Sequence, residues 1–164
     1  IWLNRYSGGV WNTAELMEKD NSEDTSSVDP FIVFGPENQA FAMWVQVGLA
    51  ESELKLKYFS LEDGWDLIPE TIGTSNEISN PSIKFDREGN AIAVWVGGFP
   101  LGHIFANRYS KLTSIWAGAF SIESINDKAS SVTLAPLLED GRILSIWSHL
   151  NGENFSLVSA LFSD

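Results

Sequence analysis

Apolar and polar residues alternate along short segments of this chain, and the segments return with a period near 50 residues. In "NPSIKFDREGNAIAVWV" (80–96), Ile83 and Phe85 alternate with polar neighbours, a turn containing Gly89 follows, and an apolar run comes next. Alternation of this kind favours half-buried β-strands, and a glycine between two such strands favours a hairpin turn. The stretch therefore predicts one complete β-hairpin.

The same hairpin pattern occurs twice more, as "DPFIVFGPENQAFAMWV" (29–45) and "VTLAPLLEDGRILSIWS" (132–148). Asn38 in the first copy and Gly141 in the third stand where the middle copy has Gly89. Glycine adopts a positive φ without a steric penalty, and asparagine tolerates it better than most residues. We therefore expect a positive φ at all three positions.

Aromatic residues repeat with the same spacing. Trp44, Trp95 and Trp147 are separated by 51 and 52 residues, and "IWLNRYS" (1–7) returns as "IFANRYS" (104–110). Two further series, with steps of 54 and 51 and of 53, 50 and 53 residues, are Trp11, Trp65, Trp116 and Tyr6, Phe59, Tyr109, Phe162. A period near 50 is typical of propeller blades. We expect each Trp of the first series to pack against a neighbouring blade.

Each unit contains four strand-like segments, which in the middle copy are 81–86, 91–98, 103–110 and 114–123. Four short antiparallel strands per unit describe a blade of a β-propeller. The fold class that we predict is therefore all-β, a propeller of four-stranded antiparallel blades of about 50 residues, with about three blade equivalents in this chain.

The predicted units divide residues 1–164 as one propeller segment: a half blade at 1–18, blades at 30–73 and 81–124, and an incomplete blade at 131–163. Three units do not close a ring, because propellers typically have at least four blades. We expect either the remainder of a longer chain or a homodimer that closes a six-bladed ring. An open segment would expose strand edges and apolar sheet faces.

The repeat resembles the blades of secreted bacterial β-propeller proteins with sialidase-like, Asp-box-related repeats. The residues that carry the resemblance are "NPSIKFDREGNAIAVWV", the "ANRYS" segment and the turn before Trp116. The Asp-box S-x-D-x-G-x-T-W spacing is absent, since the turns read "SGGVW", "SLEDGW" and "SKLTSIW". A kelch-like resemblance is the second choice, because Gly97 and Gly98 precede Tyr109 in one copy. The resemblance implies a secreted or periplasmic bacterial protein, with the cytoplasm left open.

Composition narrows the classes of partner. The chain is acidic, with 22 acidic and 10 basic residues and a net charge of −12, which disfavours nucleic acid and anionic membrane surfaces. No apolar run approaches the ~20 residues that a membrane span needs, so we expect no membrane insertion. The chain has no cysteine, so disulfides and thiolate metal sites are excluded.

Catalysis is not expected from the arginine pattern. A sialidase resemblance would imply an arginine triad, a tyrosine nucleophile and an aspartate acid/base. The four arginines fall instead on repeat-equivalent strand positions (Arg5 and Arg108) and in hairpin turns (Arg87 and Arg142). We predict no enzymatic activity, no catalytic residue and no cofactor.

Ligand binding is expected on the loops that join second to third strands, at 48–53, 97–103 and 149–154. The groups there best suited to a polyol are Phe99, His103, Asn151 and Glu153, and His149 is a further candidate recognition group at these loops. We expect both histidines at the surface. The ligand would be a glycan or another protein.

One acidic run, at 18–29, has the start of a Ca²⁺ loop. Asp20, Ser22 and Asp24 alternate as its first ligands do, but Thr25 and Phe31 replace the glycine and glutamate of such a loop. We interpret the run as a solvated connection.

The function that we predict is a non-catalytic binding module; the alternatives are a fragment of a larger propeller enzyme, such as a sialidase-like glycosidase, and a structural segment of a larger assembly.

Overall fold

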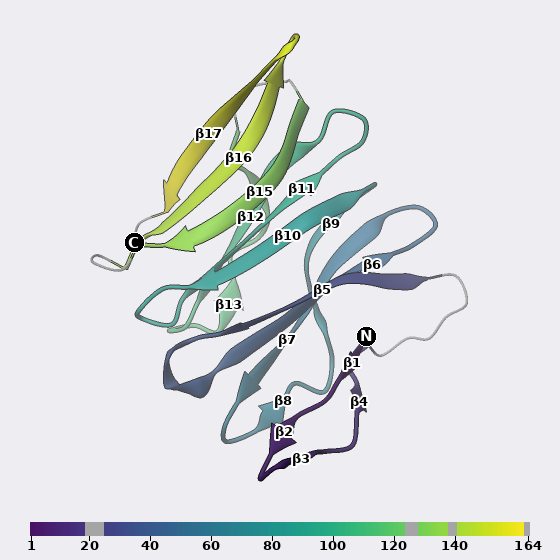
Figure 1. The fold of residues 1–164 in the computed structure, drawn as a ribbon, viewed down its shortest axis with the longest axis vertical. Helices are drawn as coiled ribbons and strands as arrows, with labels where there is room; N and C mark the ends of the chain where they lie inside the picture. Colours follow the sequence, from purple (N-terminus) through teal and green to yellow (C-terminus); the bar gives the residue numbers. More distant parts are fainter. Residues whose placement is uncertain (19–24, 124–127, 138–140, 163–164) are drawn as a thin grey trace.

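A computed structural model describes residues 1–18, 25–123, 128–137 and 141–162 of the chain. Its regular elements are strands, together with one short 3-10 turn, η1 (Pro36–Asn38). Paired strands are antiparallel throughout the described residues. Figure 1 shows the sheets following one another in chain order, from the N-terminal strands in purple to the last sheet in green and yellow.

The chain begins with four two-residue strands, which we call the N-terminal strands. They are β1 (Trp2–Leu3), β2 (Tyr6–Ser7), β3 (Val10–Trp11) and β4 (Glu15–Leu16). β1 pairs with β4, and β2 pairs with β3. In the repeat these strands correspond to the third and fourth strands of a unit.

Three larger sheets follow. The first sheet contains β5 (Ser26–Phe34), β6 (Ala40–Val47), β7 (Ser52–Ser60), β8 (Gly64–Trp65) and β9 (Glu70–Ser75). The second sheet contains β10 (Ile78–Phe85), β11 (Ala91–Gly97), β12 (His103–Ser110), β13 (Ile115–Trp116) and β14 (Phe120–Ser121). The third sheet contains β15 (Lys128–Pro136), β16 (Ile143–Asn151) and β17 (Asn154–Phe162).

The fourth strand in the first and second sheets differs from the prediction, because it is divided. The expected single strand at 114–123 is two short strands, β13 and β14, which both pair with β12. Between them Gly118 has a φ of 106°, which takes the backbone out of the extended conformation. β8 and β9 share β7 in the same way in the first sheet.

The first strand of each unit starts three or four residues before its predicted start. The structure places a bulge there, with a positive φ of 51°, 50° and 57° at Asp29, Asn80 and Ser131. At each bulge two residues of the strand face one residue of its partner, so Pro30 and Pro81, which lie within the bulges of β5 and β10, remove no hydrogen bond from the ladder.

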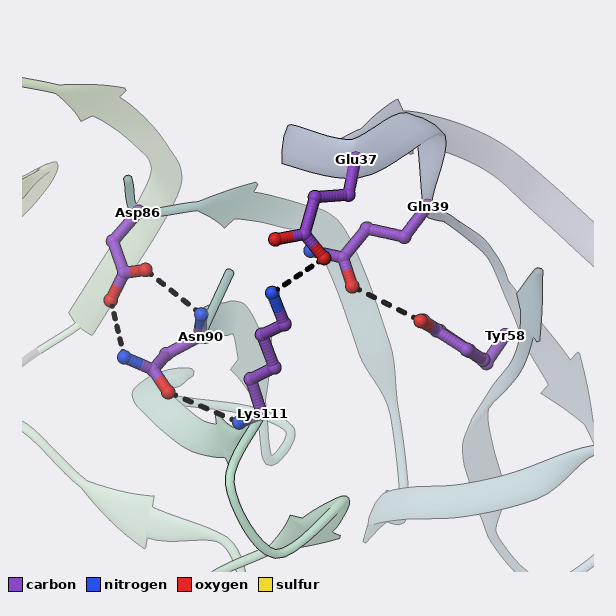
Figure 2. A network of polar contacts seen from close by, with 6 residues as sticks. All are labelled: Glu37, Gln39, Tyr58, Asp86, Asn90 and Lys111. Carbon is purple, nitrogen blue, oxygen red and sulfur yellow. Dashed lines mark hydrogen bonds and ion pairs between the residues drawn. The ribbon is translucent and has the colours of Figure 1, made fainter. Parts of the chain in front are cut away.

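The turns after these strands confirm the expected backbone. Asn38, Gly89 and Gly141 have φ values of 60°, 89° and 75°. These turns carry a polar network that links the first and second sheets (Figure 2). Lys111 of the second sheet donates from Nζ to Glu37 at 2.8 Å and from its backbone N–H to Asn90 at 3.1 Å. The link joins two units at the end of the sheets where the hairpins turn.

A second part of this network lies under η1. The Tyr58 hydroxyl donates to Gln39 Oε1 at 3.1 Å. Burial, followed by the neighbouring Tyr109, raises the pKa of Tyr58, so its hydroxyl keeps the proton that it donates. On the second sheet, Asn90 donates from its backbone and side chain to Asp86 at 2.8 and 2.9 Å.

The three repeat-equivalent tryptophans form the core of the interfaces between sheets, as expected. Trp44, Trp95 and Trp147 are all buried, and each belongs to a different apolar cluster. Trp44 packs with Met17 and Leu3 of the N-terminal segment. Trp95 lies against the first sheet, where a Cβ on Gly73 would meet its ring at 2.4 Å. Each sheet therefore inserts a tryptophan into the unit before it.

Candidate functional site

A groove lies at the end of the second sheet opposite the hairpin turns. The residue before β10, the start of β10, the loop between β11 and β12 (98–102) and the start of β15 form its walls. Its volume is about 220 Å³. The lining residues are Glu77, Ser79, Val96, Gly97, Gly98, Phe99, Pro100, Leu101, Gly102, Lys128, Ala129 and Ser130.

The loop that carries Phe99 is held on the side of the first sheet by Asn76. The Phe99 N–H donates to Asn76 Oδ1 at 3.0 Å, and Asn76 Nδ2 donates back to the Phe99 carbonyl at 3.3 Å. The Gly98 N–H also donates to the Glu77 carbonyl at 3.1 Å. These bonds fix the backbone of the loop before any ligand arrives, which lowers the ordering cost of binding.

The other end of the loop is attached to the third sheet. Ala129 N–H donates to the Gly102 carbonyl at 3.2 Å, so the loop joins two successive units. Gly102 has a φ of 70°, and a Cβ there would lie 2.6 Å from the Ala129 carbonyl oxygen. Only glycine allows this backbone contact, because any other residue would both strain φ and clash with β15.

The held loop exposes an aromatic ring beside polar groups. Phe99 is 70% exposed although its backbone is anchored on both sides. Glu77 and Lys128 supply opposite charges, and Ser79 and Ser130 supply hydroxyls. An exposed apolar ring with a few convergent polar groups is the usual composition of a binding site.

His103 lies next to this loop and forms a pair with Glu123. Its Nδ1 is 2.8 Å from Glu123 Oε1, and the Glu123 side chain is only 4% exposed. A carboxylate can only accept, so Nδ1 carries the proton when Glu123 is ionised. The second carboxylate oxygen, Oε2, is buried without a hydrogen-bond partner among the described residues. Glu123 thus orients His103 beside the loop that carries Phe99.

His149 differs from the expectation of a surface histidine. It is 3% exposed on β16, because it shares a strand face with Trp147, which points toward the preceding unit. A ligand on the surface does not reach it. Asn151 ends β16 and pairs with Asn154 of β17, and Glu153 is exposed in the turn between these strands.

The proposed Ca²⁺ ligands Asp20, Ser22 and Asp24 lie outside the described residues. Within the described ranges, no group of three or more His, Cys, Asp or Glu side chains is placed to hold a metal ion. No helix in the part of the chain that the structure covers is long and apolar enough to cross a membrane.

Four polar residues of the groove were missed by sequence reasoning: Glu77, Ser79, Lys128 and Ser130. They precede the bulges of β10 and β15, in positions that the sequence analysis assigned to connections between blades. The alternating pattern that begins after each bulge concealed that these strands extend further back. The repeat itself was a usable signal, because Ser79 and Ser130 stand 51 residues apart.

Comparisons with known proteins show the fold. No family model matches the chain, and no curated protein matches it by sequence. Among solved structures it is similar to an endo-arabinase from Bacteroides thetaiotaomicron VPI-5482, with a TM-score of 0.57 and 11% sequence identity. The match covers 93% of this chain, and this chain spans 61% of the length of that enzyme. Together with the repeating antiparallel sheets, this likeness confirms the β-propeller fold.

Proposed function

We propose that this propeller segment is a non-catalytic binding module and that the groove beside Phe99 takes a sugar ring of a glycan. The observation that carries the proposal is an exposed phenyl ring whose backbone is fixed by reciprocal hydrogen bonds to Asn76. A ring exposed in this way gains apolar contact area when a ligand covers it. The anchored loop presents this ring to solvent rather than to the core, since the ring is 70% exposed.

The size and chemistry of the groove favour a sugar over a protein ligand. Its volume of about 220 Å³ is below the ~300–1,000 Å³ of most small-molecule pockets, so it accommodates one ring-sized group. Glu77 accepts hydrogen bonds, Lys128 donates them and Ser79 does both, which matches the hydroxyls of a pyranose or furanose. A glycan would be met outside the cytoplasm, so we also propose a secreted or periplasmic location.

The test is a calorimetric titration with a panel of neutral oligosaccharides that includes arabino-oligosaccharides. We expect at least one to bind, and Phe99→Ala to weaken binding roughly tenfold or more, because truncating an aromatic anchor costs upward of ~1.4 kcal/mol. Glu77→Gln and Lys128→Ala should weaken it less. Leu112→Ala, on the exposed turn between β12 and β13, is the matched control and should bind like the wild type. Unchanged binding by Phe99→Ala, or no binding by any member of the panel, contradicts the proposal.

A second candidate is that the chain forms part of a larger propeller glycosidase. Its support is the structural similarity to the endo-arabinase, of which this chain spans 61%. A reducing-sugar assay on arabinan separates the two functions. The binding module releases no reducing ends even where it binds, whereas activity of the purified chain that survives Phe99→Ala would favour the enzyme.

A further inference from the structure

An apolar hollow of about 460 Å³ lies between the N-terminal strands and the first sheet. Arg5, Phe34, Phe59 and Trp65 are among its lining residues. Phe34, the last residue of β5, is 70% exposed there. Its repeat counterpart Phe85, the last residue of β10, is only 8% exposed. The same sequence position is thus covered in one unit and open in the unit before it.

The interface one unit further along shows what covers this position. Between the first and second sheets, Phe41 of β6 is 1% exposed and surrounded by four aromatic rings. It stacks on Phe85 at 5.0 Å, and its other neighbours lie at 5.1 Å (Tyr109), 5.4 Å (Tyr58) and 5.5 Å (Trp116). A single side chain from a second strand therefore fills the centre of the interface.

The repeat relates these four neighbours to the hollow. Each of these neighbours has a counterpart one period earlier in the sequence. Phe34 corresponds to Phe85, Phe59 to Tyr109, Arg5 to Tyr58, and Trp65 to Trp116. All four of these residues line the hollow. The internal geometry is also kept, because Phe59 and Trp65 lie 5.2 Å apart and Tyr109 and Trp116 lie 5.5 Å apart. The hollow is the counterpart of the Phe41 site.

We propose that this hollow is the docking site of a β-hairpin of the same repeat, which inserts a bulky apolar side chain at the place equivalent to Phe41. The hairpin pairs along β1 and β2 and takes the places of the first and second strands, which the described residues of the N-terminal unit do not include. Tyr6 and Trp11, a tilted pair at 5.3 Å that is largely exposed, belong to the unit that the hairpin completes. The surface continues an interface that the chain already builds between its own sheets.

The hairpin comes from a further repeat unit rather than from a second copy of this chain. The three hairpins in the structure, β5–β6, β10–β11 and β15–β16, already pair with third strands β7, β12 and β17. None can accept β1 and β2 as a third strand without losing its own. The occupant therefore carries the repeat pattern but is none of these three hairpins.

The test extends the full chain by a copy of residues 26–53 that carries Trp44→Ser and is placed directly before Ile1. The copy restores the repeat register because Ile1 corresponds to Leu54, and Trp44→Ser keeps the copy from exposing the tryptophan that each sheet inserts into the unit before it. We expect a blue shift of tryptophan emission and a loss of binding of the dye ANS, because exposed aromatic surface becomes covered. The melting temperature should rise by roughly 5 °C or more. The matched control carries Phe41→Asp in the added copy only and should lose these gains.

Four results would overturn the proposal. They are unchanged emission and dye binding in the extended protein, equal gains in the Phe41→Asp control, and aggregation of the extended protein, since a seated hairpin removes apolar surface rather than adding it. The fourth is a stable dimer of the unextended chain, seen by light scattering, in which dye binding is already lost. None of these results bears on the groove beside Phe99, so the two proposals fail separately.

Discussion

Individual glycines determine how closely successive sheets approach each other. Gly73 on β9 faces the Trp95 ring, and a Cβ there would come within 2.4 Å of it. The close approach places Trp95 in full burial at the centre of its apolar cluster. Its place in the repeat identified Trp95 from the sequence, but nothing in the pattern of the fourth strand indicated that Gly73 was its partner.

Gly73→Ala should therefore lower the free energy of unfolding by about 1–3 kcal/mol, because the added methyl group overpacks the interface. Chemical denaturation measures the change. Thr74→Ala, at the exposed neighbouring position, is the control and should stay within about 0.5 kcal/mol of the wild type. Equal effects of the two substitutions would show that Trp95 does not pack on this glycine.

A single carboxyl group gives a pH-dependent prediction. Burial, followed by repulsion from Asp66, raises the pKa of Glu70 above its ordinary value. Between the ordinary and the raised pKa, the folded chain holds a proton that the unfolded chain has lost, so stability falls as the pH rises through this window. Glu70→Gln should melt at a higher temperature than the wild type at pH 7, and at the same temperature at pH 3.

The control for Glu70→Gln is Glu62→Gln, which makes the same charge change on the exposed turn between β7 and β8. It should not reproduce the pH-dependent gain. A stability gain of Glu70→Gln that persists unchanged at pH 3 would contradict the assigned cause, because Glu70 is then protonated in both states.

At the scale of elements, the hairpins could be predicted and the outer strands could not. Alternation and the turn residues Asn38, Gly89 and Gly141 indicate the first two strands of each unit, because local sequence determines them. The bulges and the division of the fourth strand depend on where the next unit packs, which periodicity does not encode.

The repeat nevertheless singled out the segment "ANRYS", which contains Asn107. The Asn107 side chain joins two sheets, because its Nδ2 donates to the Ile72 carbonyl at 2.8 Å and its Oδ1 accepts from the Gly118 N–H at 3.0 Å.

Asn107→Ala should lower the free energy of unfolding by about 1–3 kcal/mol, because it leaves the buried Ile72 carbonyl and Gly118 N–H without their partner. Urea denaturation measures the loss. The repeat provides a matched control in Asn4, which is exposed on the N-terminal segment, so Asn4→Ala should cost less than about 0.5 kcal/mol. Similar losses for both variants would argue against a link between the sheets at Asn107.

At the scale of the whole molecule, the repeat predicts the open ends of the segment. It predicts the binding groove only in part. Large apolar side chains are exposed at both ends of the segment, on the N-terminal strands and on β17, where Phe155 and Leu157 face solvent. Sequence reasoning reached Phe99 and His103 through the loop between second and third strands. It misplaced His149, because burial on β16 depends on which face of the strand meets the preceding unit.

The most direct measurement of the central claim is an NMR titration of the ¹⁵N-labelled chain with the oligosaccharide that binds best in the panel. We predict that amide shifts change at the residues of the groove, 77–79, 97–102 and 128–130. Those on the opposite side of the sheets, at 86–90 and 111–113, should stay unchanged. Shift changes confined to the hollow around Trp65, or to none of these segments, would contradict the assignment of the binding site to the groove beside Phe99.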